Sequence, residues 1–115
     1  TLRIKIEASR ELSDFIIGFQ VKDRLGQVIF GDNTFMIYRD SSLSLSPEET
    51  ASAKFCFIMP VLPTGDYFVA AGIAEGTQEI HNIIYWIHDA VNLKVHASAV
   101  SLGLIQIPML DISLE

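Results

Sequence analysis

Apolar and polar residues alternate along several short stretches of this chain. Every second residue is apolar in residues 2–7 (LRIKIE), and the same period of two runs through residues 14–22 (DFIIGFQVK). Successive side chains of a β-strand point to opposite faces of a sheet, so this pattern predicts strands with one buried and one exposed face. Similar runs predict further strands at residues 27–31, 34–38, 51–59, 66–75 and 90–97.

Turn-forming residues separate these stretches. DRLG at residues 23–26 and GDNT at residues 31–34 carry the Asp, Asn and Gly that favour tight turns. Residues 39–50 (RDSSLSLSPEET) are polar and lack a core-forming period, which predicts an exposed loop. Roughly seven or eight short strands without βαβ alternation predict an all-β fold, an antiparallel β-sandwich.

Two further segments refine this fold. The spacing of Leu62, Gly65 and Tyr67 is typical of the tyrosine corner of immunoglobulin-like sandwiches, so the Tyr67 hydroxyl is expected to bond to backbone a few residues upstream. Residues 103–114 (GLIQIPMLDISL) form a last apolar run, and Pro108 within it predicts that part of the run lies at a sheet edge.

Residues 79–91 (EIHNIIYWIHDAV) contain two histidines, a tyrosine and the only tryptophan. Their isoleucines recur at helical spacing, which would place His81, Tyr85 and His88 together on a solvent face. As a strand, the same stretch would put Tyr85 on one side and Trp86 with His88 on the other. The periodicity does not decide between these two structures.

The length and charge of the chain indicate one domain and exclude some classes of function. A chain of 115 residues suits one domain, and its opening without Met suggests a fragment of a larger protein. The net charge is −6 and no Lys or Arg cluster is visible, which argues against nucleic acid as a partner. No apolar stretch reaches the roughly 18 residues of a membrane span.

Few residues of the sequence are candidates for a metal site or a catalytic site. The candidate metal ligands are His81, His88, Asp89 and His96, but the spacings of established zinc sites are absent. No Ser or Cys stands in a nucleophile motif, and no pair of carboxylates suggests acid and base catalysis. The sequence therefore predicts neither an enzyme, nor a metal site, nor a cofactor.

One face of the predicted sheet favours ligand binding. If residues 14–22, 66–75 and 90–97 are neighbouring strands, their outward residues form a trough with small residues in the middle strand. Amide and amine side chains flank it, and aromatic rings adjoin it, as suits a sugar chain. An ordinary solvated sheet face, with Trp86 packing a connecting segment, would explain the pattern equally well. The candidate carbohydrate-binding residues are Gln20, Lys22, Gly72, Tyr85, Trp86, Asn92, Lys94 and His96, and the trough also includes Gly18, Ala70 and Ala74.

Three segments carry a family resemblance: residues 15–35 (FIIGFQVKDRLGQVIFGDNTF), 62–76 (LPTGDYFVAAGIAEG) and 80–97 (IHNIIYWIHDAVNLKVHA). Together they resemble the C-terminal carbohydrate-binding domain of Wzt-type proteins, the ATP-binding subunits of bacterial O-antigen polysaccharide ABC exporters. The resemblance runs over essentially the whole chain. It rests on the order and spacing of these segments, because none of them is a specific motif alone.

This resemblance implies an immunoglobulin-like sandwich that forms a homodimer by exchanging its last strand. It also implies binding to the terminal part of a lipid-linked O-polysaccharide at the cytoplasmic face of the inner membrane, beside the membrane subunit of the exporter. The sequence has no GxxxxGK[ST] phosphate loop, so ATP hydrolysis is not expected of these residues. The alternative is a sandwich that only dimerises or docks to the transporter.

Overall fold

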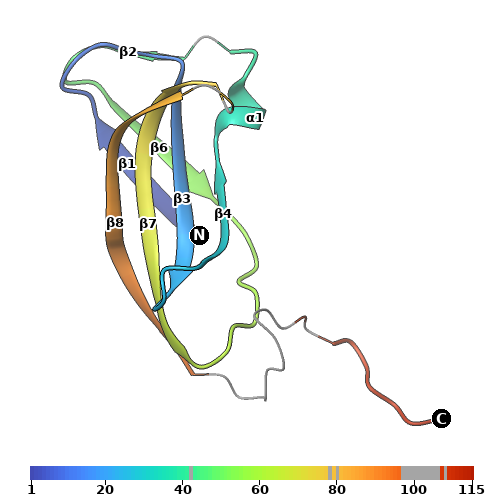
Figure 1. Ribbon diagram of the computed structural model, residues 1–115. Helices are drawn as coiled ribbons and strands as arrows, with labels where there is room; N and C mark the ends of the chain where they lie inside the picture. Colours follow the sequence, from blue (N-terminus) through green and yellow to red (C-terminus); the bar gives the residue numbers. More distant parts are fainter. Residues whose placement is uncertain (42, 78, 80, 97–106, 108) are drawn as a thin grey trace.

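The computed structural model describes residues 1–41, 43–77, 79, 81–96, 107 and 109–115. Two layers of antiparallel strands face each other (Figure 1). The larger layer is a four-stranded sheet in the order β4-β3-β7-β8, and β1 pairs with β6 in the smaller layer. The strands are β1 (Leu2–Glu7), β3 (Phe15–Asp23), β4 (Val28–Asn33), β6 (Thr50–Phe55), β7 (Gly65–Gly76) and β8 (His81–Val95).

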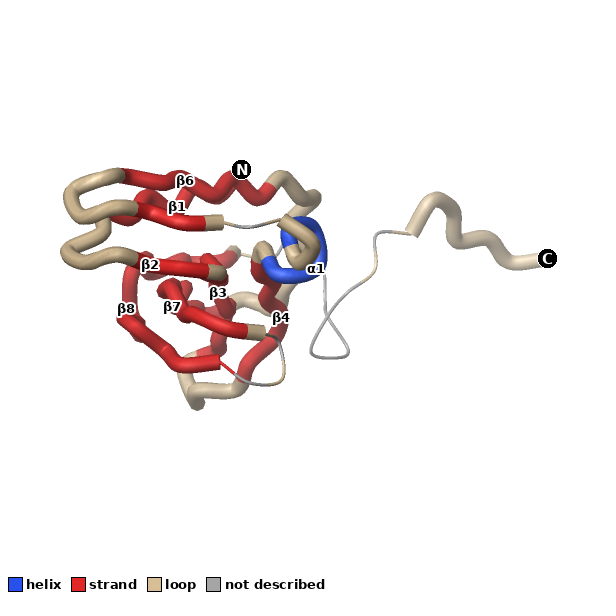
Figure 2. Tube along the Cα trace, turned by 90° about the horizontal axis from the view of Figure 1, so that it is seen from above, coloured by secondary structure: helices blue, strands red, loops and turns tan. Residues whose placement is uncertain are grey.

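Short elements close one end of the molecule. β2 (Leu12–Ser13) pairs with β5 (Ser44–Leu45), and the single turn of α1 (Phe35–Tyr38) follows β4. Viewed from above, β1 and β6 form one layer, and β3, β4, β7 and β8 form the other (Figure 2). The predicted all-β antiparallel sandwich is confirmed.

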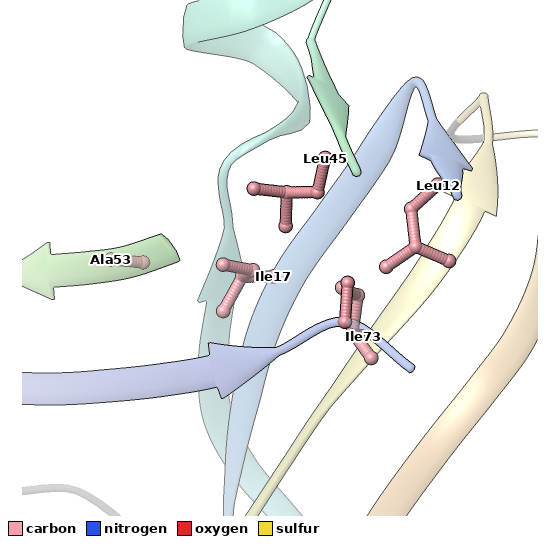
Figure 3. Close-up of a cluster of buried hydrophobic side chains, with 6 residues drawn as sticks. Leu12, Ile17, Leu45, Ala53 and Ile73 are labelled. Carbon is pink, nitrogen blue, oxygen red and sulfur yellow. The ribbon is translucent and has the colours of Figure 1, made fainter. Parts of the chain in front are cut away.

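The core lies between the two layers because alternate residues of the facing strands are apolar. One cluster of buried side chains joins strands of both layers (Figure 3). A second cluster lies between the same layers, further along β3 and β7. The first comprises Ala8, Leu12, Ile17, Leu45, Ala53 and Ile73, and the second comprises Phe19, Val21, Leu62, Tyr67 and Val69.

The tyrosine corner is present. The hydroxyl of the buried Tyr67 donates a hydrogen bond of 2.8 Å to the Pro63 carbonyl oxygen. Burial raises the pKa of this hydroxyl above its ordinary value, and the negative charge of Asp23 adds to the effect. The bond fixes the turn that leads into β7, as the spacing of Leu62, Gly65 and Tyr67 predicted.

Residues 34–38 are not the predicted strand, because the chain turns into α1 after Thr34. The Asn33 side-chain oxygen accepts a hydrogen bond of 3.0 Å from the Phe35 N–H, and the Tyr38 N–H donates to the Thr34 carbonyl at 3.2 Å. Local bonds of this kind from Asn compete with sheet pairing. A five-residue apolar run was too short to distinguish strand from helix.

The predicted last strand falls mostly outside the described residues. Residues 107 and 109–115 adopt no strand, and the large apolar side chains among them are exposed. The predicted strand exchange is therefore untested. In the part of the chain that is described, no helix has the length and apolar character needed to cross a membrane.

Candidate functional site

Residues 81–95 form one long edge strand, β8, which settles the choice between helix and strand. Its pairing with β7 has two irregularities. Three residues, 88–90, lie opposite Ala70 alone, and Ile84 is an extra residue between two regular pairs. Extra residues of this kind change the direction in which the neighbouring side chains point. The face on which each β8 side chain lies therefore follows from the observed register rather than from simple alternation.

The outer face of the four-stranded sheet is the face turned away from β1 and β6, and it is toward the viewer in Figure 1. In β3 and β7 the residues with odd numbers enter the core, so those with even numbers lie on this outer face. The predicted trough residues Ala70, Gly72 and Ala74 accordingly point outward. Three rows cross the face: Asn33, Gly18, Gly72 and Trp86; then Gly31, Gln20 and Ala70; then Lys22, Phe68 and Asn92.

Trp86 occupies the space left by the missing side chain of Gly72. A Cβ atom at Gly72 would overlap Cε3 of the Trp86 ring and the Tyr85 carbonyl oxygen, and would lie 3.0 Å from the Trp86 Cα. Glycine therefore allows β8 and the indole to approach β7 closely. The outer face is therefore covered at Gly72 by the half-buried indole of Trp86.

Lys22 and His88 meet above the middle strand. The Lys22 Nζ lies 3.3 Å from the His88 Nδ1, although the two residues belong to β3 and β8, on either side of β7. Between them, Ala70 is 0% exposed, which is consistent with larger side chains reaching over it. A small residue in the central strand thus lets two basic side chains come together.

Tyr85 lies on the opposite side of β8 from Trp86, so it does not belong to the same face. Its ladder partner is the core residue Ile73, and its side chain is 65% exposed. It lines a groove of about 410 Å³ between β8 and the segment that includes β1. Of the two candidate stacking rings, only Trp86 therefore lies on the outer face, because adjacent strand residues face opposite ways.

The remaining predicted residues lie along β3 and β8. Gln20 is half-buried on the outer face, and Asn92 and Lys94 are exposed with register partners that also face outward. Asp66 is the partner of Lys94 on β7. His96 is exposed and follows the last residue of β8, so the sheet register does not assign it to a face.

The described residues contain no group of three or more His, Cys, Asp or Glu side chains arranged to hold a metal ion. The four residues weighed as ligands are therefore not assembled into such a group, and His88 instead contacts Lys22. Sequence reasoning missed His88 as a member of the outer face. The strand interpretation of residues 79–91, which placed Trp86 and His88 on one side, was the signal that could have identified His88.

Comparisons with known proteins identify the family of the chain and support its fold. The family model of the Wzt C-terminal domain matches residues 1–107. The chain belongs to this family. A crystal structure of the C-terminal domain of Wzt is similar in fold, with a TM-score of 0.80 and 23% sequence identity. The similarity covers 97% of this chain and 68% of the crystallised chain. No curated protein sequence matches the chain.

Proposed function

We propose that this Wzt C-terminal domain is a non-catalytic glycan-recognition module. It binds the terminal part of a lipid-linked O-antigen polysaccharide and selects that chain for export by an ABC transporter. Membership of the family supports a role in the O-antigen exporter. In the larger protein the domain would act in the cytoplasm, beside the membrane subunit at the inner membrane.

The observation that carries the proposal is the position of Trp86 on Gly72, with hydrogen-bonding side chains in the neighbouring rows. Sugars offer ring faces to aromatic surfaces and hydroxyls to amides and amines. Gln20 and Asn92 provide amides, and Lys22 provides an amine, on the same face. Gly72 contributes by admitting the indole.

Weak binding at each face would be sufficient. A shallow site with a Kd of about 1 mM corresponds to roughly −4 kcal/mol. When the lipid-linked chain is held by the same exporter, linkage raises its effective concentration at the domain. The domain would then discriminate between chain ends without retaining an exported polysaccharide.

The test is a titration with purified O-polysaccharides that differ at the non-reducing end. Trp86→Ala is expected to weaken the best ligand by about tenfold, or about 1.4 kcal/mol. The double variant Gln20→Ala/Asn92→Ala should weaken it comparably. Tyr85→Ala is the matched control, since Tyr85 is the neighbouring aromatic residue on the other face of β8. If these outer-face variants bind as well as Tyr85→Ala, the face is wrongly chosen.

A second candidate function is assembly alone, through dimerisation or docking to the transporter. The exposed apolar side chains of the C-terminal tail favour it, as does the groove lined by Ile84, Tyr85 and Ile87. A strand from a second copy, exchanged as the resemblance implies, would cover such surfaces. Sedimentation of the unliganded chain measures the oligomeric state. Failure of every polysaccharide to bind a well-folded dimer would favour this function over glycan recognition.

A further inference from the structure

We propose that the solvent-facing side of the smaller layer is a docking surface for an acidic segment of another protein, one that presents carboxylates together with a large apolar side chain. This inference goes beyond the proposed function and does not depend on it, because the candidate glycan face belongs to the other layer. The docking surface combines cations on β1 and β6 with an apolar hollow beside the end of β6.

Strand pairing brings the cations together from distant parts of the sequence. Arg3 and Lys5 on β1 and Lys54 on β6 are exposed, because the residues that alternate with them pack on the core. Arg3 is the ladder partner of Lys54, and Lys5 is two residues further along the same face. Like charges directly opposite each other destabilise an antiparallel pair. The fold of the domain therefore gives no reason for this pairing, whereas an acidic partner does.

The protein does not neutralise these cations itself. The chain has 14 Asp and Glu residues against 8 Lys and Arg residues. Within the described residues, however, no carboxylate lies within 4.0 Å of the charged nitrogens of Arg3, Lys5 or Lys54. Glu7 is on the same face but at the far end of β1, opposite Thr50. A guanidinium can hold both oxygens of one carboxylate, and a neighbouring ammonium adds a second charge-assisted bond.

A hollow lined by aromatic rings adjoins the cations. Lys54 lines this hollow of about 370 Å³ together with Phe30 and Phe57. The two rings meet edge to face, with their centroids 5.7 Å apart, and Ile58 beside them is 93% exposed. Protein interfaces are enriched in arginine and aromatic side chains of this kind. The hollow thus offers a place for an apolar side chain of the same segment that supplies the carboxylates.

Charge also distinguishes between the kinds of partner. A membrane or a nucleic acid presents negative charge over its whole surface, so a domain with a net charge of −6 is repelled outside the basic face. A second copy docked through the same face would place its cations against these cations. A short acidic segment meets only the cations and the hollow, and it is therefore the partner that the surface fits.

The experiment is an NMR titration of the 115-residue chain with an end-blocked peptide in which a central Phe is flanked on each side by Glu and Asp. Saturable shifts are expected at Arg3, Lys54 and Ile58, and they should weaken with added salt because exposed ion pairs are screened. Arg3→Gln/Lys54→Gln should weaken binding about fivefold. Ile58→Ser should weaken it about threefold. The double variant should also be at least as stable as the unsubstituted chain, since it removes a repulsion.

Arg24→Gln is the matched control, because Arg24 is an exposed cation in the turn between β3 and β4. It should leave peptide binding unchanged, and a peptide with Gln and Asn in place of the acids should bind at least fivefold more weakly. Equal binding of the two peptides, or an equal loss in Arg24→Gln, would overturn the inference. Binding to phosphatidylglycerol vesicles but not to the acidic peptide would assign the face to a membrane instead. A change in sedimentation of the unliganded double variant would assign it to a second copy.

Discussion

The two faces of the four-stranded sheet differ in what their side chains do. The inner face is apolar and continuous, since the buried residues of β3 and β7 meet those of the other layer. The outer face has small residues in β7 and polar residues in β3 and β8. Because one strand contributes to both faces, substitutions at adjacent positions of β8 should have different consequences.

This contrast shows that different side chains provide stability and recognition, because successive residues of a strand point to opposite faces of the sheet. An apolar residue on the inner face is held by contacts with the opposite layer, and its loss leaves a cavity. A polar residue on the outer face has fewer neighbours, and its substitution is expected to change stability by less than about 0.5 kcal/mol. Binding should therefore be separable from folding on the outer face, except where the backbone itself is involved.

Gly72 is that exception, and it should give the largest effect. Gly72→Ala is expected to destabilise the domain by about 3 kcal/mol, although the residue faces outward, because the new methyl group meets the Tyr85 carbonyl oxygen and the indole of Trp86. Urea unfolding measures the change. Adding Trp86→Ala should restore only part of the lost stability, since the overlap with the carbonyl oxygen persists.

Gly65→Ala provides the control on the same strand. The nearest heavy atom to a Cβ at Gly65 is the Tyr67 Cε2 at 4.0 Å, so the methyl group fits without displacement. Its cost should stay below about 1 kcal/mol. Equal stabilities of the two variants would show that β8 moves away from β7 freely, and the close approach at Gly72 would then have no structural importance.

The regular strands were predictable from the sequence, and the irregular positions were not. The period of two in β3 and β7 assigned Gln20, Lys22 and Gly72 to the outer face because nothing interrupts the alternation there. In β8 the strand alternative placed His88 on the same side as Trp86, but it predicted neither the contact of His88 with Lys22 across β7 nor the extra residue Ile84 that shifts the register. No local pattern marks such a shift, since it depends on pairing with a strand that is distant in sequence.

A similar limit applies to short segments governed by side-chain hydrogen bonds. Residues 34–38 have the apolar content of a strand, but the bond from the Phe35 N–H to the Asn33 side chain accompanies a turn into α1. The tyrosine corner, by contrast, was predictable because its spacing involves only residues 62–67. A local hydrogen bond between residues at a fixed spacing could be predicted from the sequence. The outcome of competition between local side-chain hydrogen bonds and sheet pairing could not.

On the inner face, removal of one hydroxyl should have an intermediate effect. Tyr67→Phe is expected to cost about 1 kcal/mol, because it removes the 2.8 Å hydrogen bond to the Pro63 carbonyl at a buried position. Tyr85→Phe, at an exposed position of the neighbouring strand, should change stability by less than about 0.5 kcal/mol. Thermal unfolding of the two variants makes the comparison. A smaller loss for Tyr67→Phe than for Tyr85→Phe would contradict the assigned role of the corner.

The smallest effect is expected at Glu75, where the inner face reaches the end of the sheet. The Glu75 carboxylate accepts hydrogen bonds from the Ser13 N–H at 2.9 Å and from Arg10 at 2.7 Å. The Ser13 bond, followed by the Arg10 side chain, holds the pKa of Glu75 below its ordinary value. Since the pKa is lower in the folded state than in the unfolded chain, this contribution to stability is present at neutral pH. It is lost as the pH falls through the folded-state pKa.

Glu75→Gln should therefore cost about 0.5 kcal/mol at neutral pH, a modest value because both partners are partly exposed to solvent. The difference from the unsubstituted chain should shrink as the pH falls below the unfolded-state pKa of about 4.3. Urea unfolding at a series of pH values measures it. Glu7→Gln, on an exposed residue of β1, should show no such trend. A difference for Glu75→Gln that is the same at neutral and acid pH would mean that its carboxylate contributes through packing rather than through its charge.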